Sequence, residues 1–234
     1  MKGTNLSFSE MPRCKTTTFL CALLAGLLLS VTGCSERKSG TATDMSGNRY
    51  RTVSIGKQVW MAENLDVTCY RNGDPIPEVR DPKAWSELTT GAWCWYENKD
   101  EYGKRYGRLY NWYAVSDPRG LAPEGWRVAT DDDWEKLAEA LGGELVAGGA
   151  LKDARAWKSS EGTTRRSDFA LLPSGARRET DGRFLLLGEY SRLWSATESS
   201  SEKAWSRGVG YFDMALRRGE ANKRLGFAVR CLKE

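Results

Sequence analysis

The chain contains no histidine, and this absence excludes several classes of function. Its 234 residues include 35 Lys and Arg and 31 Asp and Glu, but His is not used. Ser-His-Asp and Cys-His catalysis, histidine-ligated metals and histidine proton shuttles are therefore ruled out. We expect a protein that is not an enzyme, with no catalytic residue, no cofactor and no metal.

A strong charge of one sign is also lacking. The formal net charge is +4, and the first 33 residues hold Lys2, Arg13, Lys15 and Glu10, so the remainder is near +2. Charges alternate in sign along the chain instead of forming runs. This balance argues against nucleic acid as a partner.

The chain has no apolar run long enough to span a bilayer comfortably. The apolar stretch Phe19–Val31 is too short, and basic residues precede it. It ends in Val31-Thr32-Gly33-Cys34, which resembles the lipobox of bacterial lipoproteins. Residues 1–33 are therefore predicted to be a lipoprotein signal peptide, starting at Met1 or Met11, with lipid on Cys34.

The lipobox predicts a place in the bacterial cell envelope. We expect an outer-membrane lipoprotein, held in the membrane through Cys34, and the sequence leaves open whether it faces the periplasm or the cell surface. Residues 34–48 are small and polar, which predicts a flexible tether. Residues 49–234 are long enough for one domain with a sizeable core.

Cysteine is scarce in the mature chain. Once Cys34 carries lipid, Cys69, Cys94 and Cys231 remain in an oxidising compartment. This number predicts one disulfide and one unpaired thiol, and the spacing alone does not choose the pair.

Tryptophan, in contrast, is abundant. All 10 Trp residues lie after residue 34, and core packing accounts for most of them. Exposed indole rings suit stacking on sugar rings. Five tryptophans are the candidate ligand-binding residues: Trp95, Trp112, Trp157, Trp194 and Trp205.

The stretch Gly125–Gly143 predicts a strand followed by a well-capped helix. Thr130 precedes the acidic turn Asp131-Asp132-Asp133, which resembles a capping box and matches the helix dipole. Trp134, Leu137, Ala138 and Leu141 then form one apolar face. A calcium or acid–base site at the three Asp is the alternative, and capping is favoured because calcium sites gather six or more oxygens. A second helix is predicted over residues 106–115 from its i, i+4 aromatic and apolar pairs.

Several motifs, kept in order, resemble one family. They are GWRVATDDDW from Gly125, WMAENL from Trp60, YGRLYNWYAV from Tyr106, LWSATE from Leu193 and GFAVRCLKE from Gly226. The chain resembles the Fibrobacter succinogenes major paralogous domain (FISUMP) across residues 50–233, and is distantly similar to formylglycine-generating enzymes. The resemblance implies an α+β, C-type-lectin-like fold, with two or three helices packed on small antiparallel sheets and long irregular loops.

Departures from the family pattern bear on the cysteines and on catalysis. Ala122 stands where many members have Cys, Arg127 replaces a frequent His, and Cys69 is unusual. Both Cys69–Cys94 and Cys94–Cys231 remain possible pairs, with the first preferred. The formylglycine-generating relatives use two neighbouring cysteines near the C-terminus, where this chain has Cys231 alone, so an enzyme is the less favoured reading.

These observations favour a lipid-anchored cell-surface binding module, with a glycan or a surface protein as ligand and a role such as adhesion. The alternative is a structural or assembly component of the cell envelope or of surface fibres. Calcium-dependent sugar chelation is not supported, since the triplets typical of such lectins are missing. Loops near Asn72, Lys158 and Ser199 are the expected contact surfaces.

Overall fold

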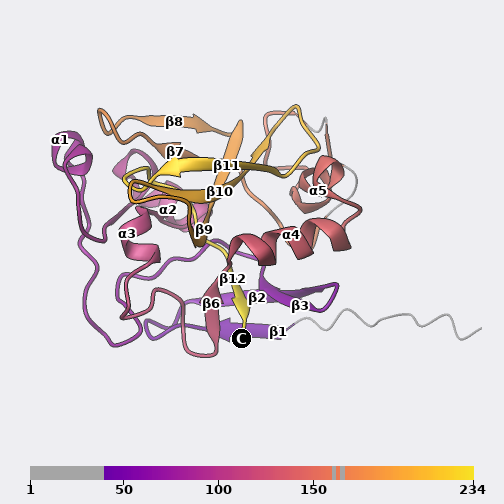
Figure 1. The fold of residues 1–234 in the computed structure, drawn as a ribbon, viewed down its shortest axis with the longest axis horizontal. Helices are drawn as coiled ribbons and strands as arrows, with labels where there is room; N and C mark the ends of the chain where they lie inside the picture. The colour runs from indigo at the N-terminus through magenta and orange to yellow at the C-terminus, as the bar shows by residue number, and fades with distance from the viewer. Residues whose placement is uncertain (1–39, 160–161, 164–166) are drawn as a thin grey trace, which may run out of the picture. The chain divides into compact units, whose positions relative to one another are not determined.

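A computed structural model describes residues 40–159, 162–163 and 167–234 (Figure 1). The predicted signal peptide and Cys34 lie outside these residues, as does part of the loop after Lys158. The described chain combines helices with mostly antiparallel sheets, which confirms the α+β class.

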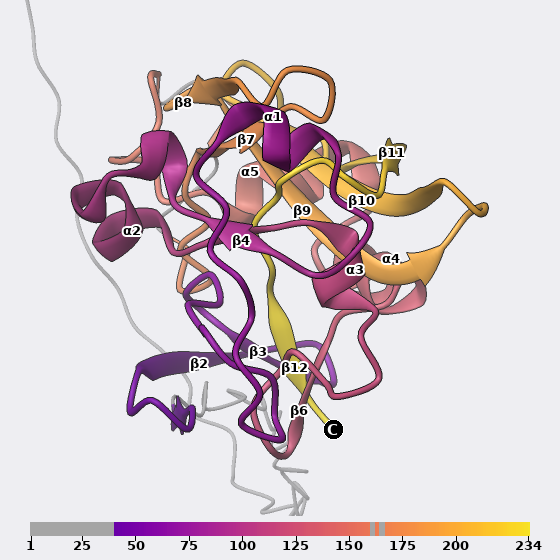
Figure 2. The same cartoon turned by 90° about the vertical axis from the view of Figure 1, so that its left-hand side faces the viewer.

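The first sheet has five antiparallel strands in the order β1-β2-β3-β12-β6. Its strands are β1 (Gly40–Thr43), β2 (Arg49–Ile55), β3 (Gln58–Met61), β6 (Trp126–Val128) and β12 (Cys231–Lys233). Leu232 of β12 lies opposite both Trp60 of β3 and Arg127 of β6. The last strand of the chain therefore occupies an inner position, as the yellow β12 among the purple and pink strands of Figure 2 shows.

The folded domain begins earlier than the sequence predicted, because residues 40–48 are not a tether. β1 pairs with β2 from Gly40 to Thr43. The Asp44 carboxylate then closes a turn by accepting hydrogen bonds from the backbone N–H groups of Ser46 and Asn48, both at 2.9 Å. Small polar residues are typical of tethers, but here pairing with a neighbouring strand decides the conformation.

The second sheet also has five strands, in the order β11-β10-β9-β7-β8. They are β7 (Ser174–Arg177), β8 (Phe184–Leu187), β9 (Tyr190–Glu198), β10 (Lys203–Gly210) and β11 (Arg217–Asn222). All neighbours are antiparallel except β7 and β9. A two-stranded pair, β4 (Trp93–Cys94) with β5 (Leu109–Tyr110), completes the strands of the described residues.

The described residues hold five α-helices, more than the two or three expected. They are α1 (Pro82–Ser86), α2 (Asp100–Tyr106), α3 (Trp112–Val115), α4 (Asp131–Ala140) and α5 (Glu144–Leu151), with a 3₁₀ turn η1 (Tyr96–Asn98) before α2. The longest, α4, is the helix predicted from the capping pattern. Thr130 and Asp133 form the expected capping box, and Trp134, Leu137 and Ala138 are buried.

The helix predicted over residues 106–115 was wrong in its first half. Tyr106 is the last residue of α2, Leu109 and Tyr110 form β5, and the chain is helical again from Trp112 onward. Asn111 caps α3 by accepting from the Ala114 backbone N–H. Tyr110 is held in an extended conformation because its backbone exchanges hydrogen bonds with Phe227, at 2.9 and 3.0 Å. A contact this distant in sequence overrides the local helical spacing.

Buried arginine side chains hold the irregular loops in place. Arg230 is fully buried and donates to the carbonyl oxygens of Met61 (3.0 Å) and Phe169 (2.8 Å). Burial lowers the pKa of Arg230 to about 9. Arg177, also fully buried, donates to Gly182 O at 3.0 Å and Arg80 O at 2.8 Å. These guanidinium groups satisfy backbone carbonyls, three of which, at Arg80, Phe169 and Gly182, lie in loops.

Candidate functional site

Three of the five candidate tryptophans belong to the core. Trp112, Trp157 and Trp194 are at most 7% exposed. Each indole N–H donates to a buried backbone carbonyl: Ser195 O at 2.9 Å, Leu171 O at 2.9 Å and Tyr110 O at 2.8 Å, respectively. The prediction that they bind a ligand is therefore wrong, because an indole satisfied inside the protein offers no face to a sugar.

The other two candidates are half-buried and covered by arginine. The Arg218 guanidinium lies 3.3 Å from the centroid of the Trp205 ring. The Arg108 guanidinium lies 5.3 Å from the centroid of Trp95. The five tryptophans thus do not come together in one aromatic surface, and cation–π contacts already use the accessible rings of Trp95 and Trp205.

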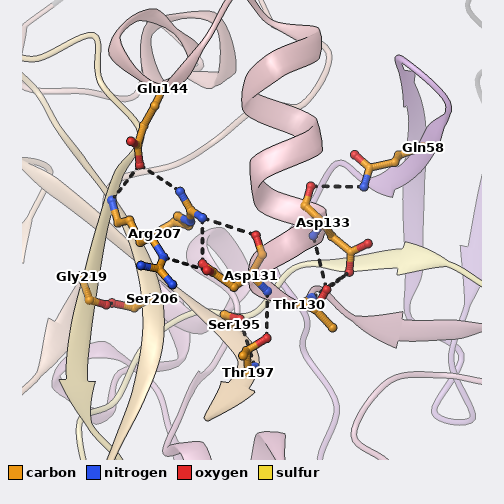
Figure 3. Close-up of polar contacts among 11 residues, drawn as sticks. Gln58, Thr130, Asp131, Asp133, Glu144, Ser195, Thr197, Ser206, Arg207 and Gly219 are labelled. Carbon is orange, nitrogen blue, oxygen red and sulfur yellow. Dashed lines mark hydrogen bonds and ion pairs between the residues drawn. The ribbon is translucent and has the colours of Figure 1, made fainter. Parts of the chain in front are cut away.

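The acidic start of α4 joins the helix to the second sheet (Figure 3). The Asp131 carboxylate accepts from Arg207 Nη2 and from Arg218 Nε, both at 2.7 Å. Arg207 is 1% exposed and also donates to Glu144 Oε1 at 2.9 Å. This ion-pair network fixes α4 and α5 against β10 and β11. No group of three or more acidic or cysteine side chains in the described part of the chain is arranged to hold a metal ion.

Asp133 faces the other way and completes the cap. It accepts from Arg127 Nη2 at 2.8 Å and from the Thr130 backbone N–H at 2.8 Å. Burial alone would raise the pKa of Asp133, but the hydrogen bonds from Arg127 and Thr130 outweigh it and lower the pKa to about 2. The alternative to capping, a calcium or acid–base site at the three Asp, has no geometric support at Asp131 or Asp133, because both carboxylates are engaged by arginine side chains.

We expect an Asp133→Asn variant to lose stability in a pH-dependent way. The folded-state pKa is below the ordinary value, so the unfolded chain binds more protons as the pH falls. The contribution, about 2 kcal/mol at pH 7, should be lost between about pH 4 and pH 2. Urea unfolding at a series of pH values should show the gap between wild type and variant closing over that range. An equal gap at all pH values would contradict the assignment.

A hollow on the second sheet offers a better candidate site than any tryptophan. It has a volume of about 380 Å³, and its lining comes from β7, β8, β9 and β11. Tyr190 lies within it as a half-buried ring. A Cβ atom on Gly208 would lie 2.5 Å from Tyr190 Oη, and one on Gly210 would lie 3.2 Å from Tyr190 Cε2. The ring therefore rests with one face against the glycines of β10, which leaves its other face toward the hollow.

Polar and apolar groups surround this ring. Arg192 lies with its guanidinium 5.7 Å from the Tyr190 centroid and uses Nη1 to donate to Ser206 Oγ at 2.9 Å. Leu185 and Leu186 form an exposed apolar edge of the same lining. The Glu220 side chain lies on the opposite face of β11, where its carboxylate pairs with Lys203 at 3.5 Å. The flat ring can stack on one face of a sugar, and the guanidinium beside it can donate hydrogen bonds to the sugar hydroxyl groups.

The sequence contained a weak signal for this hollow. Arg207-Gly208-Val209-Gly210 alternates glycine on one strand face, and the register places Gly210 opposite Tyr190. Such a glycine row leaves room for a flat ring on the neighbouring strand. The tryptophan content does not indicate this hollow, because the ring at its centre is that of Tyr190.

The expected disulfide is not formed, because Cys69, Cys94 and Cys231 are all free thiols. Cys94 on β4 and Cys231 on β12 lie in different apolar clusters of the core. Burial raises the pKa of each of these two thiols to about 12, so neither is a reactive thiolate. Cys69 is half-buried in a loop and pairs through its backbone with Pro75.

Within the ranges that the structure describes, no helix is long and apolar enough to cross a bilayer.

Comparison with known proteins gives a match to one family model. Neither the curated proteins nor the solved structures include a match to this chain. Residues 53–233 match the family described as the Fibrobacter succinogenes major domain, and the chain therefore belongs to that family.

Proposed function

We propose that this protein is a non-catalytic, glycan-binding module of the bacterial envelope, anchored in the outer membrane by lipid on Cys34. The hollow around Tyr190 is its binding site. The lipobox supports the anchor, and the flat tyrosine beside Arg192 supports a sugar ligand.

We further propose that the domain is C-type-lectin-like and distantly related to formylglycine-generating enzymes. The sequence motifs support this, and so does the first sheet, in which β12 pairs with strands from the beginning of the domain.

The proposed binding hollow lies on the strands of the second sheet, and not on the loops near Asn72, Lys158 and Ser199.

The arrangement of Tyr190 is the observation that carries the proposal. Large ligand-binding rings are useful when they are held in place before the ligand arrives, because little side-chain entropy is then lost on binding. Gly208 and Gly210 hold this ring against β10. The apolar edge around it excludes water from the stacking face.

A Tyr190→Ala variant should bind its glycan about tenfold more weakly, since loss of one aromatic stacking face removes roughly 1.4 kcal/mol. The ligand is first identified by screening a glycan and polysaccharide array with the mature chain from residue 34, carrying Cys34→Ser. Calorimetry with wild type and variant then gives the change in affinity.

Tyr113→Ala is the matched control, because Tyr113 is also half-buried but lies on α3, outside the hollow. It should leave affinity unchanged. A blank array across all glycan classes, or equal losses from the two variants, would overturn the proposal.

A role in assembly is the second candidate, and Leu186 favours it. This residue is 51% exposed at the edge of the hollow and has a φ of 63°, a left-handed conformation that is strained for a branched side chain. An exposed, strained apolar residue fits a protein contact. Self-association in light scattering that is lost in Leu186→Lys, together with a blank array, would favour assembly over sugar binding.

A further inference from the structure

The link between the proposed anchor and the folded domain is short. Gly40 already pairs with Thr52, so only residues 35–39 separate Cys34 from the first sheet. A fully extended chain spans at most about 3.6 Å per residue, which places Gly40 within about 22 Å of Cys34. A lipid on Cys34 would hold this edge of the domain close to the membrane surface.

A polar groove opens beside the same edge. It has a volume of about 370 Å³ and lies between β2 and α2. Figure 2 shows these two elements on the same side of the domain. Arg49 and Arg51 line it from β2, and Lys104 and Arg105 line it from the last turn of α2. Arg51 also lines a neighbouring hollow at the start of β1, together with Gly40 and Asp168.

The strand that carries Arg49 and Arg51 is held in place from its inner face, where the Tyr50 side chain is buried. Tyr50 Oη donates to Asp44 Oδ2 at 2.7 Å and accepts from the Asp66 backbone N–H at 3.2 Å. Arg108 forms an ion pair with the Asp66 carboxylate. Burial raises the pKa of Tyr50, so its hydroxyl keeps its proton and remains a donor to Asp44. A ligand would therefore meet a fixed surface.

The charges that line the groove leave a positive excess. Each carboxylate in the lining has a basic partner: Glu63 with Arg51 at 2.6 Å, Asp66 with Arg108, and Asp153 with Arg155 at 3.3 Å. Arg49, Lys104 and Arg105 are exposed, and none of them has an acidic partner within 4 Å among the described residues. The two acidic residues of α2 lie in its first turn and do not line the groove.

We infer that this basic groove docks on the anionic phosphate headgroups of the membrane in which the protein is anchored. The inference rests on the anchor of the proposed function and is independent of the sugar site. The short link supplies a high local concentration of headgroups, and Arg49, Lys104 and Arg105 supply the attraction. The domain is then held in one orientation, with its first sheet toward the lipid.

Vesicle binding tests the inference without the lipid anchor. The mature chain with Cys34→Ser should co-sediment with vesicles of phosphatidylcholine and phosphatidylglycerol and should not co-sediment with phosphatidylcholine alone. Arg49→Gln/Lys104→Gln/Arg105→Gln should weaken binding about 100-fold, or roughly fivefold per basic residue. Raising the salt from about 0.1 M to about 1 M should abolish it, because the screening length falls from about 10 Å to about 3 Å.

A second triple variant provides the matched control. Lys83→Gln/Lys136→Gln/Arg183→Gln removes the same charge from exposed side chains outside the groove and should bind like wild type. Equal binding to both vesicle types, or equal losses from the two triple variants, would overturn the inference. Urea unfolding of all variants confirms that the fold is retained.

The anchor is decided separately, by the mass of the N-terminal peptide of the full chain purified from membranes. A diacylglycerol-modified Cys34 supports the anchored arrangement. An unmodified Cys34 would overturn docking at an anchored edge, even if the vesicles bind, and it would leave the sugar-binding test unaffected.

Discussion

An Asp131→Ala variant should be about 3 to 5 kcal/mol less stable to unfolding than the wild type. Arg207 is 1% exposed, and its Nε atom already has no partner. Removal of Asp131 leaves this buried guanidinium with Glu144 as its remaining carboxylate and breaks the contact of the Arg218 side chain with α4. Breaking a buried ion pair by deleting one partner is strongly destabilising. Urea unfolding followed by tryptophan fluorescence measures the difference.

The neighbouring residue provides the control for this variant. Asp132 is 67% exposed and pairs with Lys136 one helical turn away. Asp132→Ala removes the same charge from the same helix end and should change stability by at most about 0.5 kcal/mol. If the two variants were equally destabilised, the helix dipole would explain the acidic start of α4, and the network of Figure 3 would not.

Trp194→Ala should also destabilise the protein by about 3 to 5 kcal/mol. Trp194 is 0% exposed and packs against Phe227 with ring centroids 4.5 Å apart. Truncation leaves a large cavity and removes one of the two hydrogen bonds that the Tyr110 carbonyl accepts. Chemical denaturation should show the loss at every pH at which the domain folds.

Trp205→Ala tests the contrast between the two tryptophans. Trp205 is half-buried at the sheet surface and contacts Arg218, so its removal should lower stability by about 1 kcal/mol. A loss as large as that of Trp194→Ala would contradict the division into core and surface rings. Glycan binding should be unaffected by Trp205→Ala, since this ring lies outside the Tyr190 hollow.

Sequence patterns predicted correctly the features that depend on contacts within one element. The cap at Thr130 and the apolar face of α4 follow from spacing within one helix, and both are confirmed. The glycine alternation near Gly208 could also be seen in the sequence, but its meaning depends on a register with β9 that spacing does not provide.

The elements that the sequence did not predict are formed by pairing between strands that are distant in the sequence. Gly40–Thr43 is a strand because β2 lies beside it, and Tyr110 is extended because Phe227 lies opposite. The tryptophans were misjudged for a related reason: an indole serves equally well in a core or on a surface, and only the tertiary structure tells which. Arg108 and Arg218 then cover the two rings that remain accessible.

The position of β12 has a consequence for the order of events during folding. The first sheet needs residues 231–233 between β3 and β6, so its inner hydrogen bonds form only after nearly the whole domain has become available. Pairings this far apart in sequence are slow to form and keep the chain open until the end. A domain completed by its last strand therefore cannot close its first sheet before the C-terminal residues are in place.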